Sequence, residues 1–155
     1  MSTSTAQRTY TIKEAAALTG LPASTLRYYE QIGIITPIDR GQSSKHRIYT
    51  DEDLDLLTWV ACLSATGMSV SDMRSYVENR TAGDAAAKQQ IELLSAQRAR
   101  LALEAERLAV RQRYVELKID YWSAVAAGDD AKVERLSREA RALADDLRPP
   151  KTTTT

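Results

Sequence analysis

The sequence predicts a mainly α-helical chain, and three patterns lead to that prediction. Two short helical patterns meet at a tight turn over residues 19–22, and a β-branched stretch followed by a loop over residues 34–50 indicates a hairpin. From about residue 84, apolar residues recur every seven positions. We therefore expect an N-terminal domain over 8–80, a long helix over 84–127, a short amphipathic helix over 131–148, and disorder over 1–7 and 149–155.

The first two helices form a predicted helix-turn-helix. Thr11 suits the N-cap of the first helix, with Glu14 at the capping-box spacing. Gly20 suits its end, and Pro22 suits the first turn of the second helix, which runs to about residue 32. This motif commonly lays its second helix in the DNA major groove. We expect DNA contacts from hydroxyl, phenol and cationic side chains of both helices: Thr11, Lys13, Ser24, Thr25, Arg27, Tyr28 and Tyr29.

Residues 34–50 predict a small β-hairpin wing. The stretch 34–38 is extended and β-branched, and Pro37 confines it to an edge. Residues 41–44 form a loop, and 47–49 return as a short strand. The polar residues at the tip or on the return strand are expected to contact DNA, the alternative being a solvated turn: Lys45, His46, Arg47 and Tyr49.

Two further helices follow the wing. The third opens on acidic residues 51–53, which favour a helix N-terminus, and ends at Gly67. Its apolar residues cover nearly the whole circumference, so two sides need burial, one of them against a second element such as a partner subunit. Ser69, with Asp72 three residues later, caps the fourth helix.

The long helix over 84–127 predicts a coiled coil. About 44 residues would extend roughly 66 Å at 1.5 Å per residue, too far for a small domain to cover, so a homodimer is expected. The residues of its seam follow 3,4 spacing: Ile91, Leu94, Arg98, Leu101, Ala105, Leu108, Gln112, Val115, Ile119 and Trp122.

An antiparallel pairing of two such helices is the preferred arrangement. A parallel pair would place Arg98 against its own copy. An antiparallel register centred between Ala105 and Leu108 avoids this, and it brings Glu104 of one chain near Arg111 of the other. The expected architecture is thus a winged helix-turn-helix domain, an antiparallel coiled-coil helix and a short C-terminal helix.

Composition narrows the function classes. The net charge is zero, but residues 1–50 carry six basic and three acidic residues, which is the local positive charge that a DNA footprint needs. One cysteine and one histidine are too few for a typical zinc site within one chain. A single cysteine also cannot form a disulfide within the chain, which is consistent with a cytoplasmic protein. No apolar run is long enough for a membrane span. With no catalytic constellation or phosphate loop either, we expect no enzyme, no metal and no cofactor.

The chain resembles MerR-family transcriptional regulators. The strings that carry the resemblance are 10–16 (YTIKEAA), 25–30 (TLRYYE), 33–35 (GII) and 47–49 (RIY). The resemblance implies DNA contacts from Arg27 and Tyr28 on the recognition helix and from Arg47 on the wing, with Tyr49 supporting the wing. It also implies RNA polymerase as a partner at the promoter. Lys45-His46 stands where family members often have Gly-Tyr.

A finer resemblance points to the AdhR/NmlR-like branch, which is associated with electrophile and thiol stress. It rests on residues 61–69, 74–77, 83–84, 97–98 and 118–122. Metal-sensing members use cysteines near the end of the dimer helix, and this chain has none there.

Two sites leave alternatives open. Cys62 is either a candidate thiol sensor, as the branch resemblance implies, or a buried and inert core residue on an apolar helix. Trp122, with Tyr114 and Tyr121, either belongs to the coiled-coil seam or lines a pocket for a small-molecule effector together with the last helix.

The leading functional prediction is a homodimeric regulator that binds an inverted-repeat operator in double-stranded DNA. The family resemblance implies that it bends and untwists this DNA, with a small molecule or an electrophile as effector. The alternative is an architectural or scaffold DNA-binding protein, or a constitutive repressor, without an effector response.

Overall fold

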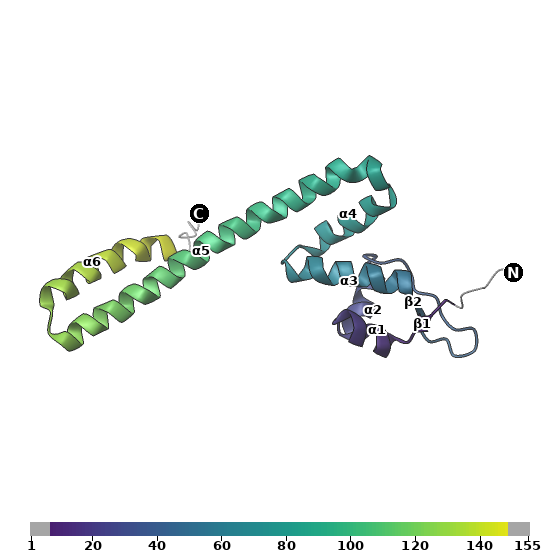
Figure 1. Cartoon of the computed structure of the whole chain (residues 1–155), viewed down its shortest axis with the longest axis horizontal. Coiled ribbons are helices and arrows are strands. Elements are labelled where there is room, and N and C mark those ends of the chain that lie inside the picture. The colour runs from purple at the N-terminus through teal and green to yellow at the C-terminus, as the bar shows by residue number, and fades with distance from the viewer. Residues whose placement is uncertain (1–6, 149–155) are drawn as a thin grey trace, which may run out of the picture. The chain divides into compact units, whose positions relative to one another are not determined.

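The mainly α-helical prediction is confirmed by a computed structural model, which describes residues 7–148 (Figure 1). The elements are β1 (Thr9–Tyr10), α1 (Ile12–Thr19), α2 (Ala23–Gln31), β2 (Tyr49–Thr50), α3 (Asp51–Ala65), α4 (Val70–Thr81), a 3₁₀ turn η1 (Gly83–Ala86), α5 (Ala87–Ala127) and α6 (Asp130–Leu147). The chain divides after Gln97 into two compact units. The predicted disorder at the two ends falls, except for Gln7, outside the described residues.

Three helix boundaries are set by caps that the sequence predicted. Thr11 and Glu14 form a reciprocal capping box at the start of α1, and Gly20 ends that helix with φ 73°. Ser69 accepts a hydrogen bond from the Asp72 backbone N–H at the start of α4. Each cap satisfies backbone groups that a helix end otherwise leaves without partners.

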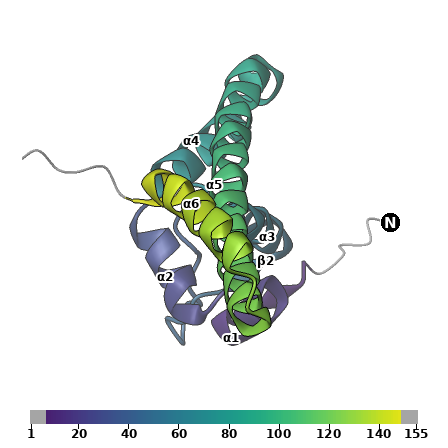
Figure 2. The ribbon, with the colours of Figure 1, turned by 90° about the vertical axis from the view of Figure 1, so that its left-hand side faces the viewer.

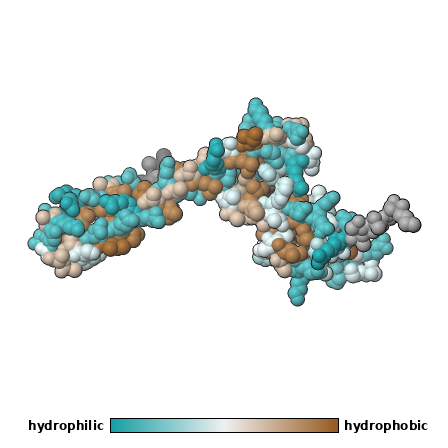
Figure 3. Space-filling view, in the orientation of Figure 1, coloured by the Kyte–Doolittle hydropathy of each residue, from teal (hydrophilic) through white to brown (hydrophobic). Residues whose placement is uncertain are grey.

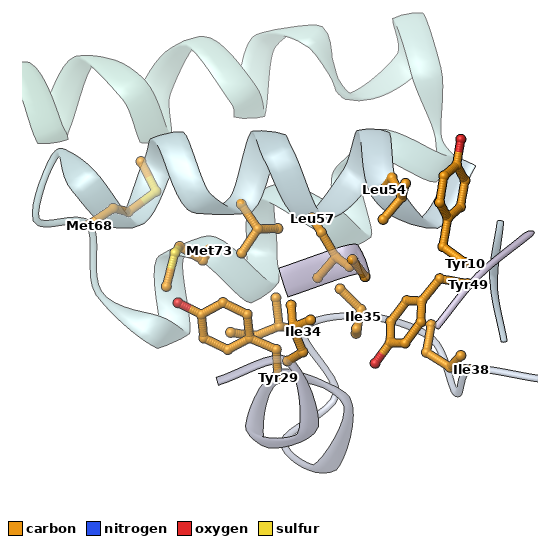
Figure 4. Packing of buried hydrophobic residues seen from close by; sticks show 13 residues of the cluster. Tyr10, Tyr29, Ile34, Ile35, Ile38, Tyr49, Leu54, Leu57, Met68 and Met73 are labelled. Carbon is orange, nitrogen blue, oxygen red and sulfur yellow. The ribbon is translucent and has the colours of Figure 1, made fainter. Parts of the chain in front are cut away.

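The core of the first unit gathers side chains from α1, α2, α3, α4 and the segment between α2 and β2 (Figure 4). Leu26 of α2, Leu57 of α3 and Tyr49 of β2 are fully buried. A helix-turn-helix is therefore held by one shared core, with α2 packed by its apolar face only.

The hairpin differs from the prediction. Residues 34–38 were expected to form a strand, but Ile34, Ile35 and Ile38 instead turn their side chains into the core, and the segment forms no strand. The partner of Tyr49 in the sheet is Tyr10, in an antiparallel pair that the sequence did not reveal. The wing itself is joined by an isolated bridge between Arg40 and Arg47.

Helix α3 is buried on one side only within the described chain. Leu54, Leu57 and Val60 face the core, whereas Trp59 is 48% exposed. Cys62 is exposed as well, so within the single chain it is not the buried core residue that one interpretation assumed. The guanidinium of Arg80 lies 4.5 Å from the centroid of the Trp59 ring.

In the second unit, α6 folds back along α5 (Figures 1 and 2). Leu117 and Ala124 of α5 and Leu136 of α6 are the buried centre of this contact. Within residues 7–148, no helix has the length and apolar character needed to cross a bilayer.

Truncation of Leu57 should destabilise the first unit strongly. Leu57→Ala leaves a cavity among fully buried side chains, so we expect a loss of about 2–5 kcal/mol in the free energy of unfolding. The matched change Leu18→Ala, at a helical leucine that is 62% exposed, should cost about 0.5 kcal/mol or less. Denaturant titration measures both, and equal losses would contradict the core assignment.

Candidate nucleic-acid interface

Helix α2 presents a polar face to solvent. Leu26 and Tyr29 are buried, and this burial leaves Ser24, Arg27 and Tyr28 on the exposed side, with Tyr28 48% exposed. The spacing of one helical turn places the hydroxyl of Ser24 and the guanidinium of Arg27 on neighbouring parts of one face. These groups can donate to phosphate oxygens and to base edges.

Tyr29 does not lie on this face. It was expected to contact DNA, but only 5% of it is exposed, and its ring packs beside Ile34 and Met73 in the core (Figure 4). Because Tyr29 lies at the i+3 position from Leu26, both side chains point to the same side of α2. The prediction for Tyr29 is therefore corrected to a core role.

The start of α1 adds two exposed residues. Lys13 is exposed in the first turn. Thr11 is exposed too, but its hydroxyl accepts the Glu14 backbone N–H at 3.2 Å. Thr25 of α2 is half-buried. A helix N-terminus with an exposed lysine favours anionic groups.

The wing ends in an exposed basic tip. The backbone closes with hydrogen bonds from Gly41 N–H to the His46 carbonyl and from Lys45 N–H to the Gly41 carbonyl, both 2.9 Å. Lys45 adopts φ 59°, the one positive value at a non-glycine position among residues 7–148. The side chains of Lys45 and His46 are exposed. The turn thus presents these two side chains at its end.

An ion pair ties the wing to the recognition helix. Arg47 Nε donates to Glu30 Oε2 at 2.6 Å, and the two side chains are only 21% and 13% exposed. Glu30 also accepts the Ile38 backbone N–H at 3.3 Å. Partial burial raises the pKa of Glu30, but the hydrogen bonds from Arg47 and Ile38 outweigh it and leave that pKa below its usual value. Arg47 therefore joins the wing to α2.

The role of Glu30 was missed at the level of sequence. Glu30 and Arg47 lie seventeen residues apart, and no periodicity links them. The only available signal was their presence in the two strings that carried the family resemblance.

Tyr49 supports the base of the wing from inside the core. It is fully buried, and its hydroxyl has no hydrogen-bond partner among the described residues. Burial raises the pKa of this phenol. A direct DNA contact by Tyr49 is therefore corrected to the supporting role that the family resemblance implied.

The predicted seam of α5 is exposed along its whole length. Among its large apolar residues, Ile91 is 65% exposed, Leu108 52% and Trp122 64%. The remaining members are exposed as well: Leu94, Arg98, Leu101, Ala105, Gln112, Val115 and Ile119. Figure 3 shows apolar surface on this part of the molecule.

An open apolar groove of about 570 Å³ lies on the distal part of the same helix. All of its lining residues belong to α5, among them Tyr114, Val115, Ile119 and Trp122. Of the two alternatives left open for Trp122, the structure favours a place on the exposed seam. Tyr121 packs against the α5–α6 cluster, whereas Trp122 is 64% exposed.

Comparisons with known proteins agree with the fold described above. Residues 10–80 match the model of the MerR HTH family regulatory protein. An uncharacterized HTH-type transcriptional regulator of Haemophilus influenzae is 32% identical over 109 residues, which cover 70% of this chain and 78% of the relative. The HTH-type transcriptional regulator AdhR of Bacillus subtilis is 34% identical over 90 residues, covering 58% of this chain and 64% of AdhR.

A solved structure extends the likeness beyond the matched domain. The crystal structure of HiNmlR, a MerR family regulator lacking the sensor domain and bound to promoter DNA, superposes with a TM-score of 0.64. The two sequences are 29% identical, and the superposition covers 83% of this chain and 96% of HiNmlR. The chain therefore belongs to the MerR family of helix-turn-helix transcriptional regulators.

Proposed function

We propose that this protein is a homodimeric regulator that binds an inverted-repeat operator in promoter DNA. The observation that carries the proposal is the exposed polar face of α2 beside an exposed basic wing tip: Ser24, Arg27, Tyr28, Lys45 and His46. The relationship to HiNmlR, whose crystal structure contains promoter DNA, supports the same function.

In this proposal the recognition helix and the wing make different contacts with the DNA. Arg27 contacts base edges in the major groove or phosphates of the flanking backbone. Lys45 at the wing tip makes phosphate contacts, which strengthen binding at low salt for any sequence. Arg47 is held by Glu30, so its first task is to keep the wing beside α2.

The exposed α5 seam supports the homodimer. The seam repeats at 3,4 spacing from Ile91 to Trp122, and its large apolar side chains remain exposed in the single chain. Association of two copies would remove this surface from water, at roughly 25 cal/mol per Å² of apolar area. The antiparallel register centred between Ala105 and Leu108 remains the preferred one.

Two recognition helices held by such a dimer would bind two half-sites on one face of the DNA. We infer that the dimer bends and untwists the promoter so that RNA polymerase engages both promoter elements. Because the deformation has an energetic cost, an effector needs to shift the balance between two states by only a few kcal/mol.

Arg27→Ala should weaken operator binding. The loss of one base or phosphate contact is expected to reduce affinity about tenfold or more, since a good base contact contributes roughly 1–3 kcal/mol. Fluorescence anisotropy with an operator isolated by genome-wide mapping of bound sites provides the measurement. Arg138→Ala, at an exposed arginine of α6, is the matched control and should change affinity by less than about threefold. Similar losses in both variants would contradict the assignment of α2.

The antiparallel register predicts a specific cross-link. In a Cys62→Ser background, which removes the exposed native thiol, the pair Glu104→Cys with Arg111→Cys should form disulfides between subunits under mild oxidation. Non-reducing electrophoresis reports the product. Efficient cross-linking through Arg98→Cys alone, or through Gln112→Cys alone, would instead indicate a parallel pair.

Cys62 is the proposed thiol sensor. Its exposure on α3 and the resemblance to the electrophile-responsive branch support this role. A quinone should form an adduct at Cys62 that mass spectrometry locates, and it should change transcription from the operator in a purified system. Cys62→Ser should abolish the response while DNA binding without the quinone stays intact. A normal response of the serine variant would end the thiol-switch hypothesis, whereas no response of the wild-type protein would favour the architectural alternative.

A further inference from the structure

A buried amide of α5 holds the end of α3. Gln97 Nε2 donates to the carbonyl oxygen of Thr66 at 2.8 Å, and Thr66 is the C-cap of α3. Gln97 is 5% exposed, and it is the one buried polar residue among the described part of the chain. A buried polar side chain is costly unless it is hydrogen-bonded, so this contact constrains the geometry between α5 and the α3–α4 turn.

A second glutamine joins α5 to α4. Gln90 Nε2 donates to the Tyr76 carbonyl oxygen at 2.9 Å, and Gln90 Oε1 accepts from Asn79 Nδ2 at 3.2 Å. Gln90 and Gln97 are seven residues apart, which places them on one face of α5. Both ends of the Gln90 amide are therefore used to hold α4.

Helix α4 in turn holds the recognition helix. Arg74 Nη2 donates to the carbonyl oxygen of Ile32 at 2.6 Å, and Ile32 is the C-cap of α2. A guanidinium at this end also complements the negative end of the helix dipole. The contacts thus run from α5 through α4 to the end of α2.

The adjoining stripe of the same stretch of α5 carries the seam. Ile91 and Leu94 are 65% and 41% exposed, whereas Gln97 is buried. One short stretch of α5 therefore carries two kinds of side chain. The amides of Gln90 and Gln97 hydrogen-bond to the α3–α4 part of the DNA-binding unit, and Ile91 and Leu94 belong to the seam proposed to contact the partner subunit. Movement of α5 within the dimer would be passed to the recognition helix through these hydrogen bonds.

We infer that Gln97, Gln90 and Arg74 are positioning residues that set the distance and rotation between the two recognition helices of the dimer. The inference rests on the proposed DNA-binding homodimer. It predicts that these residues control which half-site spacing is accepted, and that they have little effect on how one α2 binds one half-site. One added base pair moves a half-site by about 3.4 Å and rotates it by about 34°.

Gln97→Met tests the inference, because methionine keeps the length of the side chain and removes the donor. The DNA probes are an inverted repeat selected from a random library by the wild-type protein, the same repeat with one central base pair added or removed, and a single half-site. The wild-type affinity should fall about tenfold when the spacing changes. For Gln97→Met we expect a fall of less than about threefold, with half-site affinity within about twofold of wild type.

The matched control is Gln89→Met, at an exposed glutamine of α5, which should keep the wild-type spacing preference. Arg74→Lys is the second variant, and it should also reduce the preference because a single ammonium replaces the guanidinium. Circular dichroism confirms that each variant is folded before binding is measured. If Gln97 or Arg74 gains a folding defect, Gln90→Met supplies the same test.

Two results would overturn the inference. One is an unchanged spacing preference in the folded variants, and the other is a parallel loss of affinity for the half-site and for every spacing, which would indicate a general structural role. Failure of the proposed function looks different, because the wild-type protein would then select no inverted repeat at all.

Discussion

An apolar stripe that stays uncovered within residues 7–148 is the constraint on which the rest of the account depends. Helix α5 runs for 41 residues, and its seam from Ile91 to Trp122 stays exposed although α6 folds back on the same helix. The contact with α6 uses a different stripe, centred on Leu117 and Ala124. The helix therefore has one apolar stripe covered by α6 and another that is exposed, and the second is the stripe that the proposed homodimer would cover.

The DNA-binding unit must expose polar groups on short elements that depend on the rest of the unit for their stability. Helix α2 has nine residues and would not be stable alone. Burial of Leu26 and Tyr29, the Arg74 contact with Ile32 and the Glu30–Arg47 ion pair together fix this helix and its wing. The backbone that presents Arg27 is then ordered before DNA binds, which lowers the ordering cost of association.

Local patterns could be predicted from the sequence, and long-range partners could not. The caps at Thr11, Gly20 and Ser69 obey rules that span a few residues, so the helix boundaries followed from them. The pairing of Tyr49 with Tyr10 and the burial of Tyr29 depend on how the elements fold together. Tyr29 looked like a DNA ligand because a phenol suits either a core or a phosphate. The amide contacts of Gln90 and Gln97 carry no periodic signal that separates them from solvated glutamines.

The mass of the protein in solution is the most direct test of the central claim that the seam joins two copies. Light scattering on the size-exclusion peak should give twice the chain mass of 17.2 kDa, and Leu108→Glu should shift the particle toward a single chain while its helical content is kept. The same variant should lose its preference for an inverted repeat over a single half-site. A wild-type particle of 17.2 kDa that still selects an inverted repeat would contradict the account.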